Sequence, residues 1–278
     1  AQCQGEIPQQ GSRQLMAVKL DPRLLTIAEM VRKDGKICDV GTDHALLPCY
    51  LFEQGAGDVI ASDVNEGPLK AAEATVRQYG AENCVSVMKS DGLRDVPPCD
   101  DVIVAGMGGE LIARIVTECA FKNENTNFIL QPMTKAEILR TELYANGFEI
   151  TEERTAQSAG KIYTVMLVKF TGNKQEISDK FAFFGKNSDA AYVDHIKEKL
   201  RKMAKGNEKY NELYAKFNNL NKLLAWGHAR VIENVLDKVP DCPRALSDKF
   251  GADFLIKNAL MEKGRKIILE QSYKLFIL

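Results

Sequence analysis

The feature that most constrains the fold is an alternation of short apolar runs with amphipathic stretches between residues 36 and 146. The apolar runs occupy 36–41, 58–63, 84–91, 100–106 and 127–132, and the amphipathic stretches occupy 45–54, 67–80, 108–119 and 134–146. Short apolar runs separated by helical segments are typical of parallel strands joined by crossover helices. The sequence therefore predicts an α/β fold, with a parallel sheet covered by helices on both faces.

Both ends of this alternation carry their own signals. Before it, Asp21 followed by Pro22 predicts the N-cap and first position of a helix. After it, residues 147–170 hold two consecutive strand patterns joined by a short polar turn at Gly160. Parallel strands need a long crossover, so a short turn implies an antiparallel hairpin at the end of an otherwise parallel sheet.

From Ala190 the pattern becomes purely helical. One apolar seam covers Val193 to Met203 and a second covers Tyr210 to Leu224, both stepping by three and four residues. Both seams stay apolar only if the helix breaks at Gly206-Asn207, so we expect two antiparallel, coiled-coil-like helices.

These patterns divide the chain into four parts. We expect a disordered leader or upstream sequence at 1–15, the α/β domain at 16–172, a basic helical hairpin at 173–225 and a helical tail at 226–278. Within the tail, 239–251 is interpreted as a proline-broken linker and 252–278 as one more helix.

The charge is divided unevenly between the two parts of the chain. Residues 1–170 carry 17 basic and 24 acidic side chains, whereas residues 171–278 carry 20 basic and 14 acidic ones. A cationic second part suits a polyanionic partner, although charge alone favours a merely solvated lysine-rich surface.

Composition also excludes several classes of protein. No run approaches the roughly 18 apolar residues of a membrane helix, so no membrane partner is expected. The seven cysteines show no C-x-x-C or Cys/His spacing and there are only three histidines, which argues against a metal site. Scattered cysteines fit a reducing compartment, so we expect a cytoplasmic protein. The oligomeric state stays open, with a monomer favoured.

Chemistry in such a sheet is expected outside the carboxyl ends of the strands. Asp39, Asp63 and Asp91 lie at or near the ends of the first three runs, and Gly106–Gly109 begin at the end of the fourth. A carboxylate at Asp63 suits a ribose diol, and one at Asp91 suits an exocyclic amine such as adenine N6.

The turn after the first run further limits the class of ligand that is expected. It lacks G-x-G-x-x-G and carries the acidic Asp39 and Asp43, which disfavours a pyrophosphate. A ligand with a ribose, an adenine and a positive charge fits better, and S-adenosylmethionine has all three. Each residue also has a structural explanation, such as a helix cap for Asp43 or a plain turn for a glycine. Acidic residues at three successive strand ends are harder to explain in that way.

Five segments resemble one known family. They are DVGTDHALLP (39–48), ASDVNEGPL (61–69), SDGL (90–93), AGMGGELI (105–112) and LQP (130–132). From about Leu20 to Phe170, the chain is similar to the TrmK-type bacterial tRNA (adenine-22-N1)-methyltransferases. The resemblance implies a Rossmann-like class I methyltransferase sheet followed by a helical, coiled-coil-like C-terminal domain. The resemblance of the helical domain ends near Ala225, and no counterpart is identified for 226–278.

The strand ends and the resemblance together imply the site residues. For the cofactor S-adenosylmethionine they are Asp39, Gly41, Thr42, Asp63, Val64, Asp91, Gly92, Leu93, Ala105, Gly106 and Met107. For the tRNA substrate they are Gly108, Gly109, Gln131, Pro132, Lys199, Lys202 and Lys205. Methylation of adenine N1 acidifies the N6 amine, so a proton acceptor near N6 helps. Asp43 is the first candidate for this catalytic role and His44 the second; a locally bonded helix-start residue is the alternative for His44.

Three other functions compete with tRNA methylation. A methyltransferase acting on a small molecule or a protein would share the cofactor pocket but would not need a basic helical domain, and another RNA is an alternative substrate. A nucleotide-linked dehydrogenase is disfavoured by the missing G-x-G-x-x-G. A non-catalytic tRNA-binding protein would have no use for the acidic strand ends.

Overall fold

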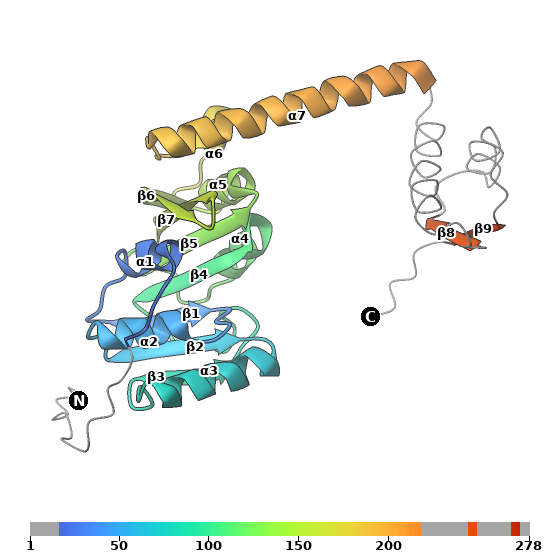
Figure 1. Cartoon of the computed structure of the whole chain (residues 1–278). Helices are drawn as coiled ribbons and strands as arrows, with labels where there is room; N and C mark the ends of the chain where they lie inside the picture. The colour runs from blue at the N-terminus through green and yellow to red at the C-terminus, as the bar shows by residue number, and fades with distance from the viewer. Residues whose placement is uncertain (1–16, 218–243, 249–267, 273–278) are drawn as a thin grey trace. The chain divides into compact units, whose positions relative to one another are not determined.

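The computed structural model describes residues 17–217, 244–248 and 268–272 of the 278-residue chain (Figure 1). The chain divides into two compact units, residues 1–198 and 199–278. The sequence predicted that the α/β domain ends at residue 172, whereas the first compact unit extends to Glu198. The added segment contains α6 and the first turns of α7, which pack on the sheet domain.

The first unit is built on a seven-stranded sheet in the order β3-β2-β1-β4-β5-β7-β6. Its strands are β1 Lys36–Val40, β2 Asp58–Asp63, β3 Val85–Lys89, β4 Asp101–Gly108, β5 Asn127–Thr134, β6 Phe148–Ser158 and β7 Lys161–Phe170. Strands β1 to β5 pair in parallel, whereas β7 runs antiparallel between β5 and β6. The predicted Rossmann-like sheet with a terminal antiparallel hairpin is therefore confirmed.

Seven helices accompany this sheet in the described part of the chain. They are α1 Pro22–Ala28, α2 Leu46–Glu53, α3 Glu66–Gln78, α4 Gly109–Thr117, α5 Ala136–Ala145, α6 Asp179–Phe184 and α7 Ala190–Phe217. The predicted start of α1 is confirmed, since the Asp21 carboxylate accepts a 2.8 Å hydrogen bond from the Leu24 amide. None of the described helices is both long enough and apolar enough to cross a membrane.

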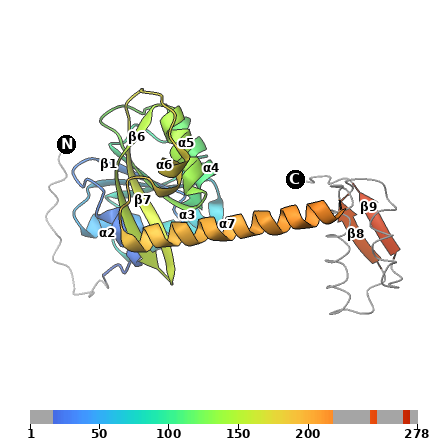
Figure 2. The same cartoon turned by 90° about the horizontal axis from the view of Figure 1, so that it is seen from above.

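Alternation along the strands separates two hydrophobic cores. Val102 and Val104 on β4 pack with α4 and α5, whereas Ile103 between them packs with α1, α2 and α3. Successive strand residues point to opposite faces, so apolar runs are needed where both faces are covered. Figure 2 shows α4 and α5 on one side of the sheet and α2 on the other.

The helix α7 differs from the prediction. It runs without interruption from Ala190 to Phe217, so the predicted break at Gly206-Asn207 is wrong. Glycine and asparagine each cost at most about 1 kcal/mol in a helix, which does not outweigh continued backbone hydrogen bonding over 28 residues. The second arm of the predicted hairpin, beyond Phe217, lies outside the described residues.

Two short strands correct the prediction for the tail. The segments β8 Arg244–Asp248 and β9 Ile268–Ser272 pair in parallel. The first lies where a linker was predicted, and the second lies where one more helix was predicted. β-branched Ile268 favours an extended backbone at the start of β9. The predicted leader at 1–15 lies outside the described residues.

Candidate functional site

A cavity of about 290 Å³ opens at the carboxyl ends of β1 and β4. Its lining contains seven predicted site residues: Asp39, Gly41, Thr42, Asp43, His44, Ala105 and Gly106. The sequence analysis missed the others, which are Arg23, Leu24, Ala45, Leu46 and Leu47. The structure thus brings the first and fourth strand ends together around one space, as expected for this kind of sheet.

Asp39 is the buried carboxylate of this cavity. Burial raises the pKa of its carboxyl to about 6, although a hydrogen bond from Thr42 and the positive charge of Arg23 both act to lower it. The amides of Gly41 and Thr42 donate to the Ser62 carbonyl at 2.8 and 2.9 Å. These bonds fold the turn after β1 across the end of β2. A buried carboxylate is costly to ionise unless a cation meets it, so the site favours a positively charged ligand.

Asp43 and His44 lie side by side at the mouth of the cavity. The His44 Nδ1 atom is 2.9 Å from the Asp43 carboxylate, and both side chains are exposed. Neither side chain caps α2, whose N-cap is the left-handed Ala45 with a φ of 50°. The helix-cap explanation of Asp43 is therefore not supported, and both side chains are accessible to a substrate.

Arg23 joins the cavity to β5. Its Nη1 atom donates a 2.7 Å hydrogen bond to the side-chain oxygen of Gln131. The same oxygen accepts a bond of 3.2 Å from the Gly106 amide, and the Gln131 Nε2 atom donates to the Pro132 carbonyl at 2.9 Å. The Gln131 side chain is completely buried. It therefore holds Arg23 and Gly106 in place instead of offering free groups to a substrate.

Three predicted cofactor residues lie at the neighbouring ends of β2 and β3. Asp63 accepts a 2.7 Å hydrogen bond from the Asn65 amide with one carboxylate oxygen, and Val64 beside it is exposed. Asp91 is engaged by two cations, with Arg94 at 3.2 Å and Arg114 at 3.6 Å. A ligand amine at Asp91 would have to share that carboxylate with both arginines. Neither aspartate lines the described cavity.

Close packing explains two of the predicted glycines. A side chain at Gly41 would be strained by its φ of 76°, and it would also displace the flexible Met107 methyl group. A side chain at Gly109 would collide with the Lys135 carbonyl, where α4 begins beside α5. These glycines let Met107 lie over the first turn and let the two helices meet.

The remaining predicted residues lie around the cavity or beneath it. Gly92 and Leu93 follow β3, and Leu93 is buried in the core beneath α4. Pro132 is buried, whereas Gly108 is half-buried at the start of α4. Leu93 and Pro132 consequently have little side-chain surface to offer to a ligand.

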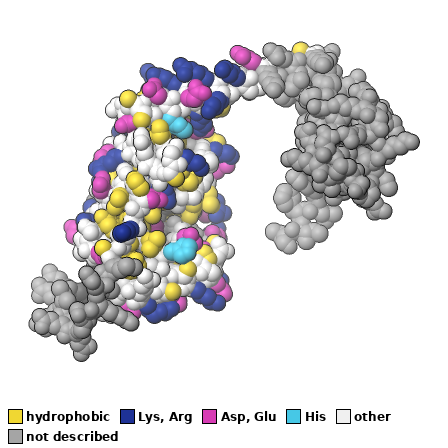
Figure 3. All heavy atoms as spheres, in the orientation of Figure 1, with side chains coloured by type: hydrophobic (Ala, Val, Ile, Leu, Met, Phe, Trp, Pro, Cys, Tyr) yellow, Lys and Arg dark blue, Asp and Glu magenta, His cyan; other side chains and the backbone are white. Residues whose placement is uncertain are grey.

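The predicted tRNA-binding lysines lie on α7. Lys202 and Lys205 are exposed and Lys199 is half-buried. Figure 3 shows Lys and Arg side chains gathered along the described part of this helix. They belong to the second compact unit, whereas the cavity belongs to the first.

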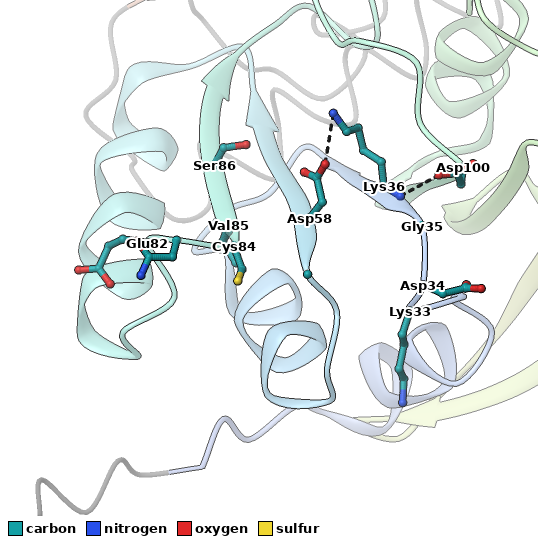
Figure 4. A pocket seen from close by; sticks show the side chains of 12 residues that line it. Lys33, Asp34, Gly35, Lys36, Asp58, Glu82, Cys84, Val85, Ser86 and Asp100 are labelled. Atoms are coloured by element: carbon teal, nitrogen blue, oxygen red, sulfur yellow. Dashed lines mark hydrogen bonds and ion pairs between the residues drawn. The ribbon is translucent and has the colours of Figure 1, made fainter. Parts of the chain in front are cut away.

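A second hollow lies at the opposite, amino ends of β1, β2 and β3 (Figure 4). Two of its carboxylates are held by Lys36, which pairs with Asp58 at 3.2 Å and whose amide donates to Asp100 at 2.8 Å. This edge carries none of the predicted site residues. Among the described residues, no group of three His, Cys, Asp or Glu side chains is placed to hold a metal ion.

Comparisons with known proteins agree with this geometry. A family model described as "Methyltransferase domain" matches residues 20–166. The tRNA (adenine(22)-N(1))-methyltransferase of Bacillus subtilis (strain 168) is 35% identical over 158 residues, which are 55% of this chain. The chain spans 66% of that enzyme's length, just under two thirds.

A solved structure is also similar over most of the chain. It is a candidate tRNA (m1A22) methyltransferase of Streptococcus pneumoniae in complex with S-adenosyl-L-methionine, with 30% identity and a TM-score of 0.62. The similarity covers 74% of this chain and 100% of that one.

A shorter stretch is similar to a protein of another class. Over 65 residues the chain is 51% identical to the ribonuclease HIII of Chlamydia pneumoniae. This stretch is 23% of the chain and only 22% of the ribonuclease, so it supports no argument about activity.

Proposed function

The chain belongs to the methyltransferase-domain family, and we propose that it transfers a methyl group from S-adenosylmethionine to N1 of an adenine in tRNA. The observation that carries this proposal is the cavity at the carboxyl ends of β1 and β4. Its lining includes Asp39 and residues 41–47, which belong to one of the segments that resemble the TrmK-type enzymes. The similar proteins of Bacillus subtilis and Streptococcus pneumoniae support adenine 22 as the target and S-adenosylmethionine as the methyl donor.

The charges of the cavity suit this methyl donor. S-adenosylmethionine carries a sulfonium and an ammonium group, and either would stabilise the ionised form of the buried Asp39. Arg23, also in the lining, matches the carboxylate of the methionine part in charge. Asp63, at the neighbouring strand end, is the proposed partner of the ribose hydroxyls.

The transfer itself needs little from the protein beyond placement. The adenine N1 lone pair attacks the sulfonium methyl carbon, the new N–C bond forms, and the S–C bond breaks with its electrons returning to sulfur. Holding the two reactants in line is the main contribution to rate. Because the Watson–Crick edge reacts, the adenine must first leave its stack or pair. The target base is proposed to enter beside Gly106–Gly109.

A proton acceptor completes the reaction. The methylated adenine is a cation until a proton leaves N6, and Asp43 is the proposed acceptor with His44 behind it. Both side chains are exposed at the cavity mouth and lie 2.9 Å apart, so a proton taken by Asp43 has a neighbouring base.

The basic residues of α7 are proposed to bind tRNA phosphates. Lys199, Lys202 and Lys205 step by three along this helix, so they share a face. Contacts of this kind release counterions and make affinity fall with salt. We also propose a cytoplasmic location, where tRNA is modified and where the described cysteines, all free, would remain reduced.

The test is incubation of the chain with methyl-labelled S-adenosylmethionine and unmodified tRNA, followed by digestion and nucleoside analysis. We expect label in 1-methyladenosine, and loss of that label from a tRNA with guanine at position 22. Label in another nucleoside would contradict the proposed target. Label in a mixed metabolite pool but none in tRNA would favour a small-molecule methyltransferase.

A further inference from the structure

A buried ion pair outside the lining of the cavity joins α5 to β6. Arg140 on α5 has no exposed surface, and neither does the side chain of Glu153 on β6. The Arg140 Nε and Nη2 atoms donate to the two carboxylate oxygens of Glu153 at 2.9 and 3.0 Å. This parallel pair of bonds fixes the plane of the guanidinium.

The other N–H groups of Arg140 reach the following segment of the chain. Nη1 donates to the carbonyls of Ala182 and Phe183 at 2.7 and 3.1 Å, at the end of α6. Nη2 donates at 2.8 Å to the hydroxyl of Tyr192, in the first turn of α7. All five N–H donors of the guanidinium therefore have partners. One side chain holds α5, β6, the end of α6 and the start of α7 together.

A second set of contacts holds the same start of α7. Asn187 and Thr155 exchange hydrogen bonds of 2.9 and 3.1 Å, and Thr155 lies two residues after Glu153, on the same face of β6. The Asp189 carboxylate then accepts a 3.1 Å bond from the Tyr192 amide. The side chain of Tyr192 and that of Ile196, one turn later, are buried. The first two turns of α7 are thus part of the sheet domain.

Stability alone does not explain a buried charge at this position. Taking an arginine and a glutamate out of water costs several kcal/mol per ion, and well-packed apolar residues often serve stability equally well. A buried arginine whose five N–H donors all have partners instead fixes one arrangement of the groups around it. Here that arrangement is the attachment of α7 to the sheet domain.

The charge of α7 indicates what this attachment serves. From Ala190 to Phe217 the helix carries seven Lys or Arg residues and four Asp or Glu residues. A basic helix attached loosely would bind a polyanion less tightly, because ordering the helix on binding would cost free energy. We propose that Arg140, Glu153 and Tyr192 are positioning residues for the tRNA substrate, because they fix the first turns of the basic helix to the catalytic domain. This inference rests on the proposed function.

The first experiment uses Tyr192→Phe, which removes the bond between Arg140 and α7 and keeps the ring. Tyr144→Phe is the matched control. Tyr144 is a buried tyrosine on α5 whose ring packs against Phe181 at 5.3 Å and whose hydroxyl bonds to the backbone of Ile150. Losing one hydrogen bond of about 0.5–1.5 kcal/mol corresponds to a change of about twofold to tenfold. We expect the KM for tRNA to rise by that factor in Tyr192→Phe only, with kcat and the Kd of S-adenosylmethionine unchanged in both variants.

A second variant separates positioning from folding. Replacing Arg140 by Met together with Glu153 by Leu removes both charges and keeps an apolar side chain at each site. We expect it to remain folded, while its KM for tRNA rises at least as much as that of Tyr192→Phe. If the double variant does not fold, Tyr192→Phe decides alone. If the wild-type chain methylates tRNA and the variants have the same KM for tRNA as the wild type, the positioning role is wrong. If the wild-type chain does not methylate tRNA, the proposed function is wrong instead.

Discussion

The side-chain oxygen of Gln131 accepts a 2.7 Å hydrogen bond from Arg23, 108 residues earlier in the chain. The same oxygen accepts a 3.2 Å bond from the backbone amide of Gly106. One buried amide at the end of β5 thereby fixes the first helix and the fourth strand end. Both of these line the cavity, so its shape depends on a residue that is not among its lining.

Gln131→Leu should therefore weaken cofactor binding without removing any cofactor contact. It leaves the Arg23 Nη1 atom and the Gly106 amide without this acceptor, at a cost of about 0.5–1.5 kcal/mol for each lost hydrogen bond, because both residues line the cavity. We expect the affinity for S-adenosylmethionine, measured by calorimetry, to fall about tenfold, together with a lower melting temperature. Gln78→Leu, the same change at an exposed position on α3, is the control and should alter neither quantity.

The sequence predicted the sheet because its pattern is local. The run at 100–106 is apolar on both faces, and β4 is indeed covered on both faces. The Asp21-Pro22 signal marks the start of α1 for the same reason, since a cap depends on the next few residues only. Strand-end residues were predictable because parallel strands bring their carboxyl ends to one edge.

The remaining features depend on contacts that are distant in sequence. The hydrogen bond to Gln131 places Arg23 in the site, and no local sequence pattern predicts that bond. Gly206 was expected to end a helix because its propensity is poor, but an unfavourable residue of about 1 kcal/mol does not end α7. The domain boundary was set too early because Arg140 looks like any helix-surface arginine until Glu153 and Tyr192 surround it.

Asp63→Ala should reduce the affinity for S-adenosylmethionine and leave the fold intact. The carboxylate ends β2 at the expected ribose position, and charge-assisted hydrogen bonds of this kind contribute about 1.5–3 kcal/mol. We expect a loss of about 10- to 150-fold by calorimetry. Asp58→Ala removes the same charge at the other end of β2, where Asp58 pairs with Lys36 on the surface, and should bind the cofactor normally. Equal affinities for the two variants would refute the ribose assignment.

Asp39 should make folding stability fall as the pH rises from about 4 to about 6. Burial raises the pKa of its carboxyl from 3.8 to about 6, so the folded state holds the proton more tightly than the unfolded state does. The stability that the Asp39 carboxyl contributes is fully present below pH 3.8 and is lost as the pH rises past about 6. The loss is about 3 kcal/mol at most. Asp39→Asn removes this ionisation, so thermal melts at pH 7 should show a higher melting temperature than the wild type.

Cofactor binding should depend on pH in the opposite direction. A cationic ligand favours ionised Asp39, so affinity should weaken by up to about tenfold per pH unit below pH 6. Asp43 and His44 line the same cavity and remain in the Asn variant. Calorimetry from pH 5 to pH 8 on both proteins isolates the contribution of Asp39. The same slope in Asp39→Asn would assign the effect to another group.

Asp43→Asn should separate the proton acceptor from the cofactor ligands. The side chain is exposed beside His44 and does not cap α2, so its loss should not disturb the fold. We expect unchanged affinity for S-adenosylmethionine and a fall of about 10²-fold or more in single-turnover methylation of tRNA. Reduced cofactor affinity with normal turnover at saturation would make Asp43 a cofactor ligand instead.

Two truncations should differ because the first compact unit ends at Glu198. A chain ending at Glu198 keeps α6 and Tyr192, so it should fold and bind S-adenosylmethionine with full affinity. A chain ending at Phe170 loses the partners of Arg140 in α6 and α7 and uncovers the ring of Tyr144. We expect it to be less stable by about 3–6 kcal/mol in urea unfolding, from lost hydrogen bonds and uncovered apolar surface. Both shortened chains lack Lys199, Lys202 and Lys205, so their tRNA affinity should fall well below that of the full chain.

Each of these lysines that meets a phosphate contributes about one unit to the slope of log affinity against log salt. A binding series from 50 to about 200 mM salt should therefore show a shallower slope for the chain ending at Glu198, whereas equal slopes would place tRNA recognition in the sheet domain.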